Sequence, residues 1–163
     1  MTNRFMKAAL AATVTVAAFA STGAQAATAT ATAKAQILQQ ITVTKTADLD
    51  YAVIVTGAAA STVVVTPAGV RTCGVGLVCT GTATAAAFGV VGTVGQVATV
   101  SVPATVSLTS GATNSMSSTL VSSTALMTLA AVNSFQVGGT LSVGASQADG
   151  AYAGNFTVTV NYQ

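Results

Sequence analysis

Strict alternation of apolar and polar residues is the feature that most constrains the fold of this chain. In residues 27–37 every odd position is apolar and every even position is polar, and Ile41 and Val43 continue the same phase. Because successive side chains of a strand point to opposite faces, a period of two indicates β-structure. The chain also has 15 glycines, abundant Thr and Val, and no convincing helical period. These features predict an all-β domain.

Apolar, β-branched runs follow one another along the chain, separated by Gly, Ser and Asn. They predict strands at residues 40–46, 51–56, 61–66, 84–91, 96–102, 105–109, 119–123, 125–129 and 134–137. A closing hairpin is predicted from residues 139–146 and 152–162, with Asp149-Gly150 in its turn. Pro103 predicts a break or an edge. Many short strands without a repeat of fixed period predict a β-sandwich rather than a propeller or a solenoid.

The N-terminus has the three parts of an export signal. Arg4 and Lys7 are basic, residues 8–20 are uncharged and mostly apolar, and Ala24-Gln25-Ala26 is a small-x-small cleavage signature. The alternative is a retained membrane anchor, but residues 8–20 are too few to span roughly 30 Å of hydrocarbon. We therefore predict a signal peptide at residues 1–26, export through the periplasm and no stable membrane span.

Charge is scarce enough to exclude several classes of function. The chain has no His, no Trp and no Glu, so acid–base enzymes that use a His or a tuned carboxylate pair are not expected. Residues 27–163 have a formal net charge of zero, with Lys34, Lys45 and Arg71 balancing Asp48, Asp50 and Asp149. Nucleic-acid binding requires a basic field that this chain lacks. We expect no enzymatic activity, no cofactor and no nucleic-acid partner.

Two small constellations remain. Asp48 and Asp50 could share one face of a strand, but a calcium site needs several more oxygens, so a solvated strand end is the preferred interpretation and no metal site is expected. Cys73 and Cys79 enclose a short loop that contains Gly74. In an exported protein such a pair predicts a structural disulfide, because a redox motif is normally Cys-x-x-Cys and a metal would need more ligands.

The C-terminal segment resembles the last strand of bacterial chaperone–usher pilins. It is an alternating strand with a penultimate aromatic residue and a glycine near its start. The residues that carry this likeness are Gly150, Tyr152, Phe156, Val158, Val160 and Tyr162. The alternative is the terminal strand of an ordinary sandwich, since alternation alone is common.

A broader resemblance covers nearly the whole of the chain after the signal. Residues 41–51 (ITVTKTADLDY), 65–69 (VTPAG), 137–141 (VGGTL) and 150–162 (GAYAGNFTVTVNY) look like a family of exported bacterial domains of unknown function. That family is similar to the spore coat protein U-like secreted pilins. The resemblance implies an immunoglobulin-like sandwich that lacks one strand and is completed by a neighbour. It also implies sister subunits, a periplasmic chaperone and an outer-membrane usher as partners. Many pilins link distant strands with their disulfide, whereas this pair of cysteines closes a local loop.

Residues 27–37 are the predicted donor strand, and residues 38–163 the predicted sandwich domain. An extended peptide can add to an open sheet edge through backbone hydrogen bonds and alternate side chains. The side chains expected to point inward are Ala29, Ala31, Ala33, Ala35 and Ile37. Alanine methyl groups bury little surface, so a flexible leader or an ordinary first strand is the alternative.

Two functions are compatible with these observations. The first is a structural subunit of a surface fibre, or fimbrium, or of a coat, assembled by strand donation after export. The second is a monomeric secreted sandwich that binds a ligand, as an adhesin or a carbohydrate-binding module does. The second function would favour exposed aromatic residues.

Overall fold

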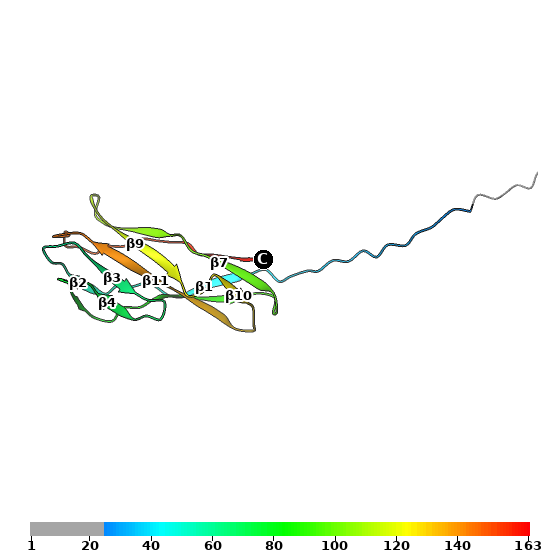
Figure 1. The fold of residues 1–163 in the computed structure, drawn as a ribbon, viewed down its shortest axis with the longest axis horizontal. Coiled ribbons are helices and arrows are strands. Elements are labelled where there is room, and N and C mark those ends of the chain that lie inside the picture. The colour runs from blue at the N-terminus through cyan, green and yellow to red at the C-terminus, as the bar shows by residue number, and fades with distance from the viewer. Residues whose placement is uncertain (1–24) are drawn as a thin grey trace, which may run out of the picture. The chain divides into compact units, whose positions relative to one another are not determined.

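The computed structural model describes residues 25–163 (Figure 1), so the predicted signal peptide lies outside the described residues except for its last two. The described part contains strands and no helix, which confirms the all-β prediction. The strands are β1 Thr42–Ala47, β2 Val53–Val55, β3 Ser61–Val65, β4 Arg71–Cys73, β5 Val78–Thr80, β6 Ala86–Val91, β7 Val97–Ser101, β8 Thr105–Ser110, β9 Asn114–Ser122, β10 Leu126–Thr128, β11 Asn133–Val143 and β12 Thr159–Tyr162. Within residues 25–163 there is no helix long and apolar enough to cross a bilayer.

The chain divides into two units, Met1–Ala35 and Gln36–Gln163. In the first unit, residues 25–35 belong to no strand and are exposed. The alternation of residues 27–37 therefore does not produce an ordinary first strand within the chain, and that alternative is wrong. The physical reason is that alanine methyl groups bury too little surface to offset the cost of ordering a backbone that has no ladder partner.

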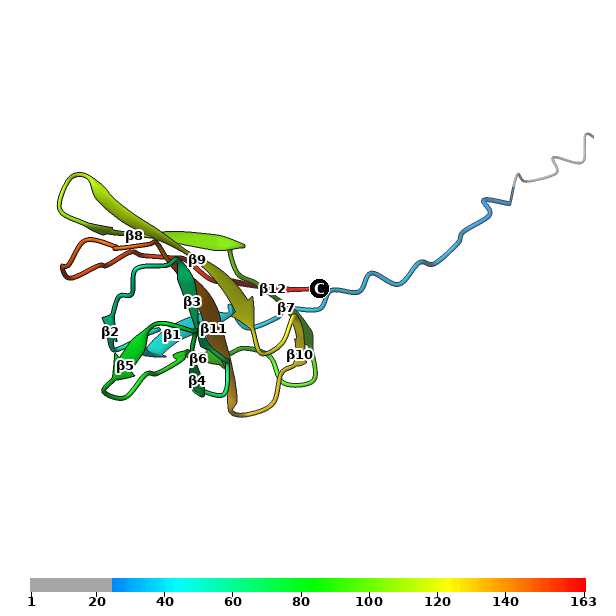
Figure 2. The ribbon, with the colours of Figure 1, turned by 60° about the vertical axis from the view of Figure 1, so that its left-hand side comes forward.

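β11 is the strand on which the second unit is built (Figure 1). Val137 pairs with Ala86 of β6 and with Ser122 of β9, so β6 and β9 lie on opposite edges of β11. Farther along, Gly139 pairs with Val65 of β3 on one edge and with β9 on the other. Consequently β6 and β3 follow each other along the same edge, and the sheet curls as its strands diverge (Figure 2). This curled antiparallel sheet, with the smaller sheets β10–β7–β12 and β2–β5, is consistent with the predicted β-sandwich.

Glycine is required on β11 at the position where its pairing changes from β6 to β3. A Cβ atom on Gly138 would lie 2.3 Å from the Val65 carbonyl oxygen and 2.6 Å from the Pro67 nitrogen. A Cβ atom on Gly139 would lie 2.4 Å from the Tyr51 hydroxyl oxygen. The Gly138-Gly139 pair therefore allows neighbouring backbone and side chains to approach closer than any side chain at these positions would permit.

Two apolar clusters form the core. The larger one lies between β6, β7, β10, β11 and β12, and contains the stacked rings of Phe88 and Phe135, whose centroids are 5.1 Å apart. The smaller one surrounds Tyr51 and the second half of β11. Leu49 packs against both clusters and joins them.

The structure corrects several of the predicted strands, and β9 begins at Asn114, five residues before the predicted start at residue 119. The closing hairpin is wrong: the second half of β11 pairs with β3 and β9, whereas β12 pairs with β7. Residues 134–137 and 139–146 were predicted as separate strands, but they belong largely to one strand, β11. The Gly138-Gly139 pair does not end this strand; it allows neighbouring residues to approach the backbone closely. The short strands β4 and β5 were not predicted, because glycines at 69, 74, 76 and 81 interrupt any apolar run around them.

Candidate functional site

The first and last strands of the second unit come together at Gly92. A Cβ atom on Gly92 would lie 2.8 Å from the hydroxyl oxygen of Tyr162 and 3.3 Å from Cγ1 of Ile41. The Tyr162 hydroxyl accepts the backbone N–H of Thr93 at 2.7 Å and donates to the carbonyl of Gln39 at 2.5 Å. One side chain thus connects the end of β12 with the residues that precede β1.

The segments that continue from these strands meet again at a pocket of about 550 Å³. Residues 49–56, which follow β1, and residues 147–152, which precede β12, form part of its wall. The apolar part of the lining includes Leu108, Met116, Leu141 and Val143. Asp50 and Asp149 also line the pocket and are exposed, so they lie at its opening.

Between Gly92 and the pocket the two segments run in opposite directions. Residues 41–56 run towards the pocket and residues 150–162 run back from it. Val43 on the first segment, and Phe156 and Val158 on the second, are half-buried and pack against the larger core cluster. In the part of the chain that the structure describes, no backbone hydrogen bond joins the two segments.

Both segments have an open edge. Within residues 25–163, β1 pairs with β6 alone and β12 pairs with β7 alone. The N–H of Gln163 donates to the carbonyl of Val97 in β7 at 3.0 Å. Because the peptide groups of a strand alternate in direction, the N–H groups of Val160 and Tyr162 point away from β7, to the open side.

The C-terminal segment keeps the alternation that the sequence predicts. Phe156, Val158 and Tyr162 are half-buried and Val160 is 7% exposed, whereas the odd-numbered residues between them are exposed. The structure forms a ladder only from Thr159 onward, although a strand was predicted from residue 152. Earlier in the segment, a bridge joins residues 109 and 153. The two contacts lie on either side of Pro103, which has no N–H to donate.

Gly150 and Tyr152, the first two residues predicted for this segment, lie outside every strand. Gly150 has a φ of 148°, and a Cβ atom there would lie 2.3 Å from the Ser110 hydroxyl oxygen. The Tyr152 hydroxyl accepts from the Gln147 amide at 2.8 Å and donates to the Ala148 carbonyl at 2.9 Å. These bonds fix the loop that forms one wall of the pocket.

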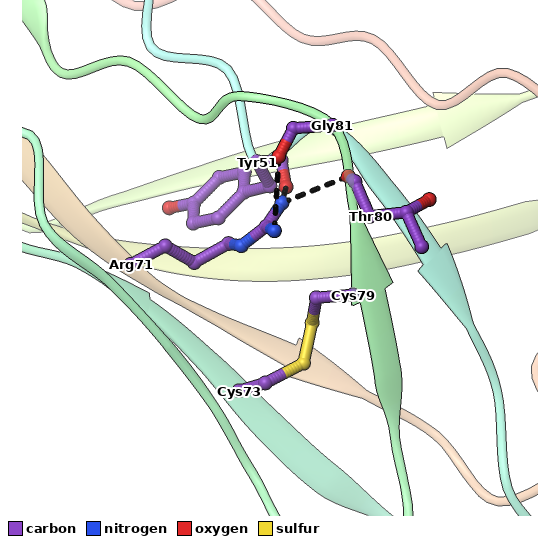
Figure 3. Close-up of a disulfide and its surroundings, with 6 residues drawn as sticks. All are labelled: Tyr51, Arg71, Cys73, Cys79, Thr80 and Gly81. Atoms are coloured by element: carbon purple, nitrogen blue, oxygen red, sulfur yellow. Dashed lines mark hydrogen bonds between the residues drawn. A yellow bond between two sulfur atoms is a disulfide. The ribbon is translucent and has the colours of Figure 1, made fainter.

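The disulfide between Cys73 and Cys79 is confirmed, with Cα atoms 6.2 Å apart (Figure 3). It connects β4 with β5, and β5 pairs with β2, whose residues line the pocket. Figure 3 also shows the Arg71 guanidinium beside the bridge, donating to the carbonyls of Tyr51, Thr80 and Gly81 at 3.0–3.1 Å. Together the bridge and Arg71 hold the two-stranded sheet in place.

Tyr51 lies beneath the pocket with its hydroxyl group 2.5 Å from the hydroxyl group of Ser118. Burial raises the pKa of the Tyr51 phenol, and the hydrogen bond with Ser118 opposes that shift in part. Both side chains are buried. The pair therefore satisfies two polar groups inside the smaller cluster.

The acidic residues have local roles. Asp48 accepts from the Lys45 ammonium at 2.6 Å, and Asp50 accepts the backbone N–H of Ala52 at 2.7 Å. Ala52 has a φ of 59°, which that hydrogen bond stabilises. Among residues 25–163 there is no group of three or more His, Cys, Asp or Glu side chains that could hold a metal ion.

The predicted donor residues are exposed. Ala29, Ala31, Ala33 and Ala35 lie outside every strand, and Ile37 is 93% exposed. The structure does not bring them together into a site, and their role as a donor stays a prediction.

Sequence reasoning missed the contacts at Gly92 and the three carbonyls that Arg71 binds. The sequence did contain a signal that Arg71 has a structural role, because it is a single arginine in a stretch of Val, Thr and Gly. The glycine pair inside an apolar run was a further signal of close backbone approach. Neither signal identifies the partner residues, which lie far away in the sequence.

Residues 41–162 match a family described as Domain of unknown function (DUF4402). The match covers more than half of the chain, and it begins and ends at Ile41 and Tyr162, the residues that meet at Gly92. Searches of the curated proteins and of the solved structures each gave no match.

Proposed function

The chain belongs to the DUF4402 family, and on that premise we propose that it is a structural subunit of a bacterial surface fibre or coat, assembled after export by β-strand donation. Its partners are copies of itself or sister subunits. A periplasmic chaperone and an outer-membrane usher are the expected helpers, because an open apolar edge must be covered before assembly.

The observation that supports this proposal is the unjoined pair of segments at the two ends of the domain. Residues 41–56 and 150–162 are antiparallel and rest on one core, with no backbone ladder between them. The apolar side chains of both segments that pack on this core are half-buried, and the N–H groups of Val160 and Tyr162 have no strand partner among the described residues. A sandwich that lacks one strand has this arrangement, and an added strand would satisfy the open amides.

Residues 27–37 have the properties of the strand that would be donated. They alternate without interruption, they form no strand within their own chain, and they precede the matched domain directly. Their affinity would come mainly from backbone hydrogen bonds, each worth about 0.5–1.5 kcal/mol net. The small alanine side chains permit close approach and add little apolar burial.

Deletion of residues 27–37 tests the proposal. The shortened protein should keep its sandwich and fail to form multimers, which size-exclusion chromatography in mild denaturant would show. A matched pair of substitutions sharpens the test: Ala31→Asp places a charge on the inward face, whereas Thr32→Asp places it on the outward face. Ala31→Asp should block assembly and Thr32→Asp should permit it. Undiminished assembly of the deletion variant would refute strand donation.

The pocket of about 550 Å³ favours a second candidate function, a monomeric secreted sandwich that binds a ligand. For a carbohydrate ligand the aromatic residues argue against it. Among the described residues Tyr51, Phe88 and Phe135 are buried, and Tyr152, Phe156 and Tyr162 are half-buried. None offers an exposed ring for stacking on a sugar. A monomer that keeps residues 27–37 and never assembles would favour this candidate.

A further inference from the structure

Few charges of the domain are free to act on a partner. Lys45 and Asp48 form the one ion pair found among residues 25–163. Arg71 donates to three backbone carbonyls and so needs no carboxylate. Lys34 is exposed and is the only charged residue in residues 27–37.

The two remaining side-chain carboxylates line one pocket. Asp50 and Asp149 come from segments about a hundred residues apart, yet both line the opening of the same pocket and both are exposed. One oxygen of Asp50 accepts from Ala52, which leaves its second oxygen available. Below the two carboxylates the pocket lining is largely apolar, with Leu108, Met116, Leu141 and Val143 among its residues.

This chemistry complements the C-terminal end of residues 27–37, which we call the extension. Ile37 is its largest apolar side chain and is 93% exposed, and Lys34 lies three residues before it. An apolar pocket with an acidic opening fits an apolar side chain close to a cation. The rest of the extension consists of Ala, Thr and Gln and offers no other distinguishing feature.

We propose that the Lys34 ammonium of one copy pairs with Asp149 and Asp50 of the next, while Ile37 enters the pocket, and that this contact sets the register of the donated strand. The inference rests on the proposed strand donation. Because Lys34 and Ile37 lie at the C-terminal end of the extension, the donated strand would run antiparallel to residues 150–162. Without such a contact, the Ala-Thr repeat could slip by two residues at little cost.

Charge reversal in the full-length exported protein tests the pairing. Lys34→Glu should weaken assembly by about 3- to 10-fold at low salt, since it sets like charges against each other at an exposed site. Adding Asp149→Lys to the same chain should recover most of the lost assembly. Asp50 is left unchanged because its side chain also accepts the backbone N–H of Ala52. Val132→Glu also introduces a glutamate, at an exposed loop position outside the two segments, and should have no effect. At high salt the differences should shrink.

A second measurement identifies the contact itself. A zero-length carbodiimide cross-linker applied to the multimer should join Lys34 to Asp149 or Asp50 of another copy, as mass spectrometry would show. If the unchanged protein assembles through its extension but Lys34→Glu assembles equally well, or Lys34 joins to other carboxylates, the pairing is refuted and strand donation stands. If assembly does not depend on residues 27–37, strand donation is refuted and the pairing falls with it.

Discussion

Replacement of Gly138 by alanine should destabilise the domain far more than the same replacement at Gly89. Both glycines lie within strands, and neither has a positive φ. A Cβ atom on Gly138 would lie 2.3 Å from the Val65 oxygen and 2.6 Å from the Pro67 nitrogen, whereas one on Gly89 would meet its nearest atom, the Thr44 oxygen, at 3.9 Å. The first contact is with backbone, which cannot rotate away, and the second is an ordinary van der Waals distance.

The size of the effect follows from these distances. A carbon–oxygen contact normally needs about 3.3–3.6 Å, so β3 must retreat from β11 by about 1 Å. Overpacking of this kind costs about 1–3 kcal/mol, and one or two weakened ladder bonds add about 0.5–1.5 kcal/mol each. Gly138→Ala should therefore cost about 1.5–6 kcal/mol. Gly89→Ala should change stability by less than about 1 kcal/mol, with a small gain from the reduced entropy of the unfolded chain.

Thermal unfolding followed by circular dichroism would measure the contrast. For a domain of this size, 1 kcal/mol corresponds to about 3–5 °C, so Gly138→Ala should lower the melting temperature by at least about 4.5 °C. Equal melting temperatures for the two variants would show that β6 and β3 do not share one edge of β11. The description of the curled sheet would then be wrong.

Three further outcomes are expected. Replacing Cys73 and Cys79 with serine should lower the free energy of unfolding by roughly 2–2.5 kcal/mol; an unchanged melting temperature would mean that the bridge does not constrain the chain. Burial raises the pKa of Tyr51 above 10.0, so the folded state keeps the phenol proton to a higher pH than the unfolded state does. The buried neutral phenol therefore contributes its full stability below pH 10, and the free energy of unfolding falls as the pH rises further. Melting curves above that pH should fall more steeply for the unchanged protein than for Tyr51→Phe, and parallel curves would contradict the assignment. Val158→Asp should sharply reduce the yield of protease-resistant protein, whereas Thr159→Asp should not; equal loss or equal tolerance would refute the register of the C-terminal segment.

The alternation of apolar and polar residues predicted those strands that are long enough to display it. β1, β3, β6, β7 and β8 fall close to their predicted positions, because five or six residues with one buried face leave a clear pattern. The same period predicted the alternating burial of residues 156–162 correctly. It could not predict which strands pair, since pairing depends on contacts between distant residues. The Asp149-Gly150 turn therefore suggested a hairpin that the structure does not form.

The candidate site was less accessible to sequence reasoning. The disulfide followed from two cysteines in a chain that is predicted to be exported, and the structure confirms the bridge. The meeting of Ile41 and Tyr162 at Gly92 depends on a hydrogen bond between residues 39 and 162, which no local pattern encodes. The pocket likewise combines five separate stretches of chain. The donor-like alternation of residues 27–37 was also visible in the sequence alone.

Hydrogen–deuterium exchange of the β12 amides tests strand donation most directly. The N–H groups of Thr159 and Asn161 point towards β7 and should be protected in both monomer and multimer. Those of Val160 and Tyr162 point to the open edge, so they should exchange rapidly in the monomer and slowly in the multimer. Protein without residues 27–37 should show no such slowing at any concentration. Equal exchange at Val160 and Tyr162 in monomer and multimer would contradict the account, because no strand would then have been added to this edge.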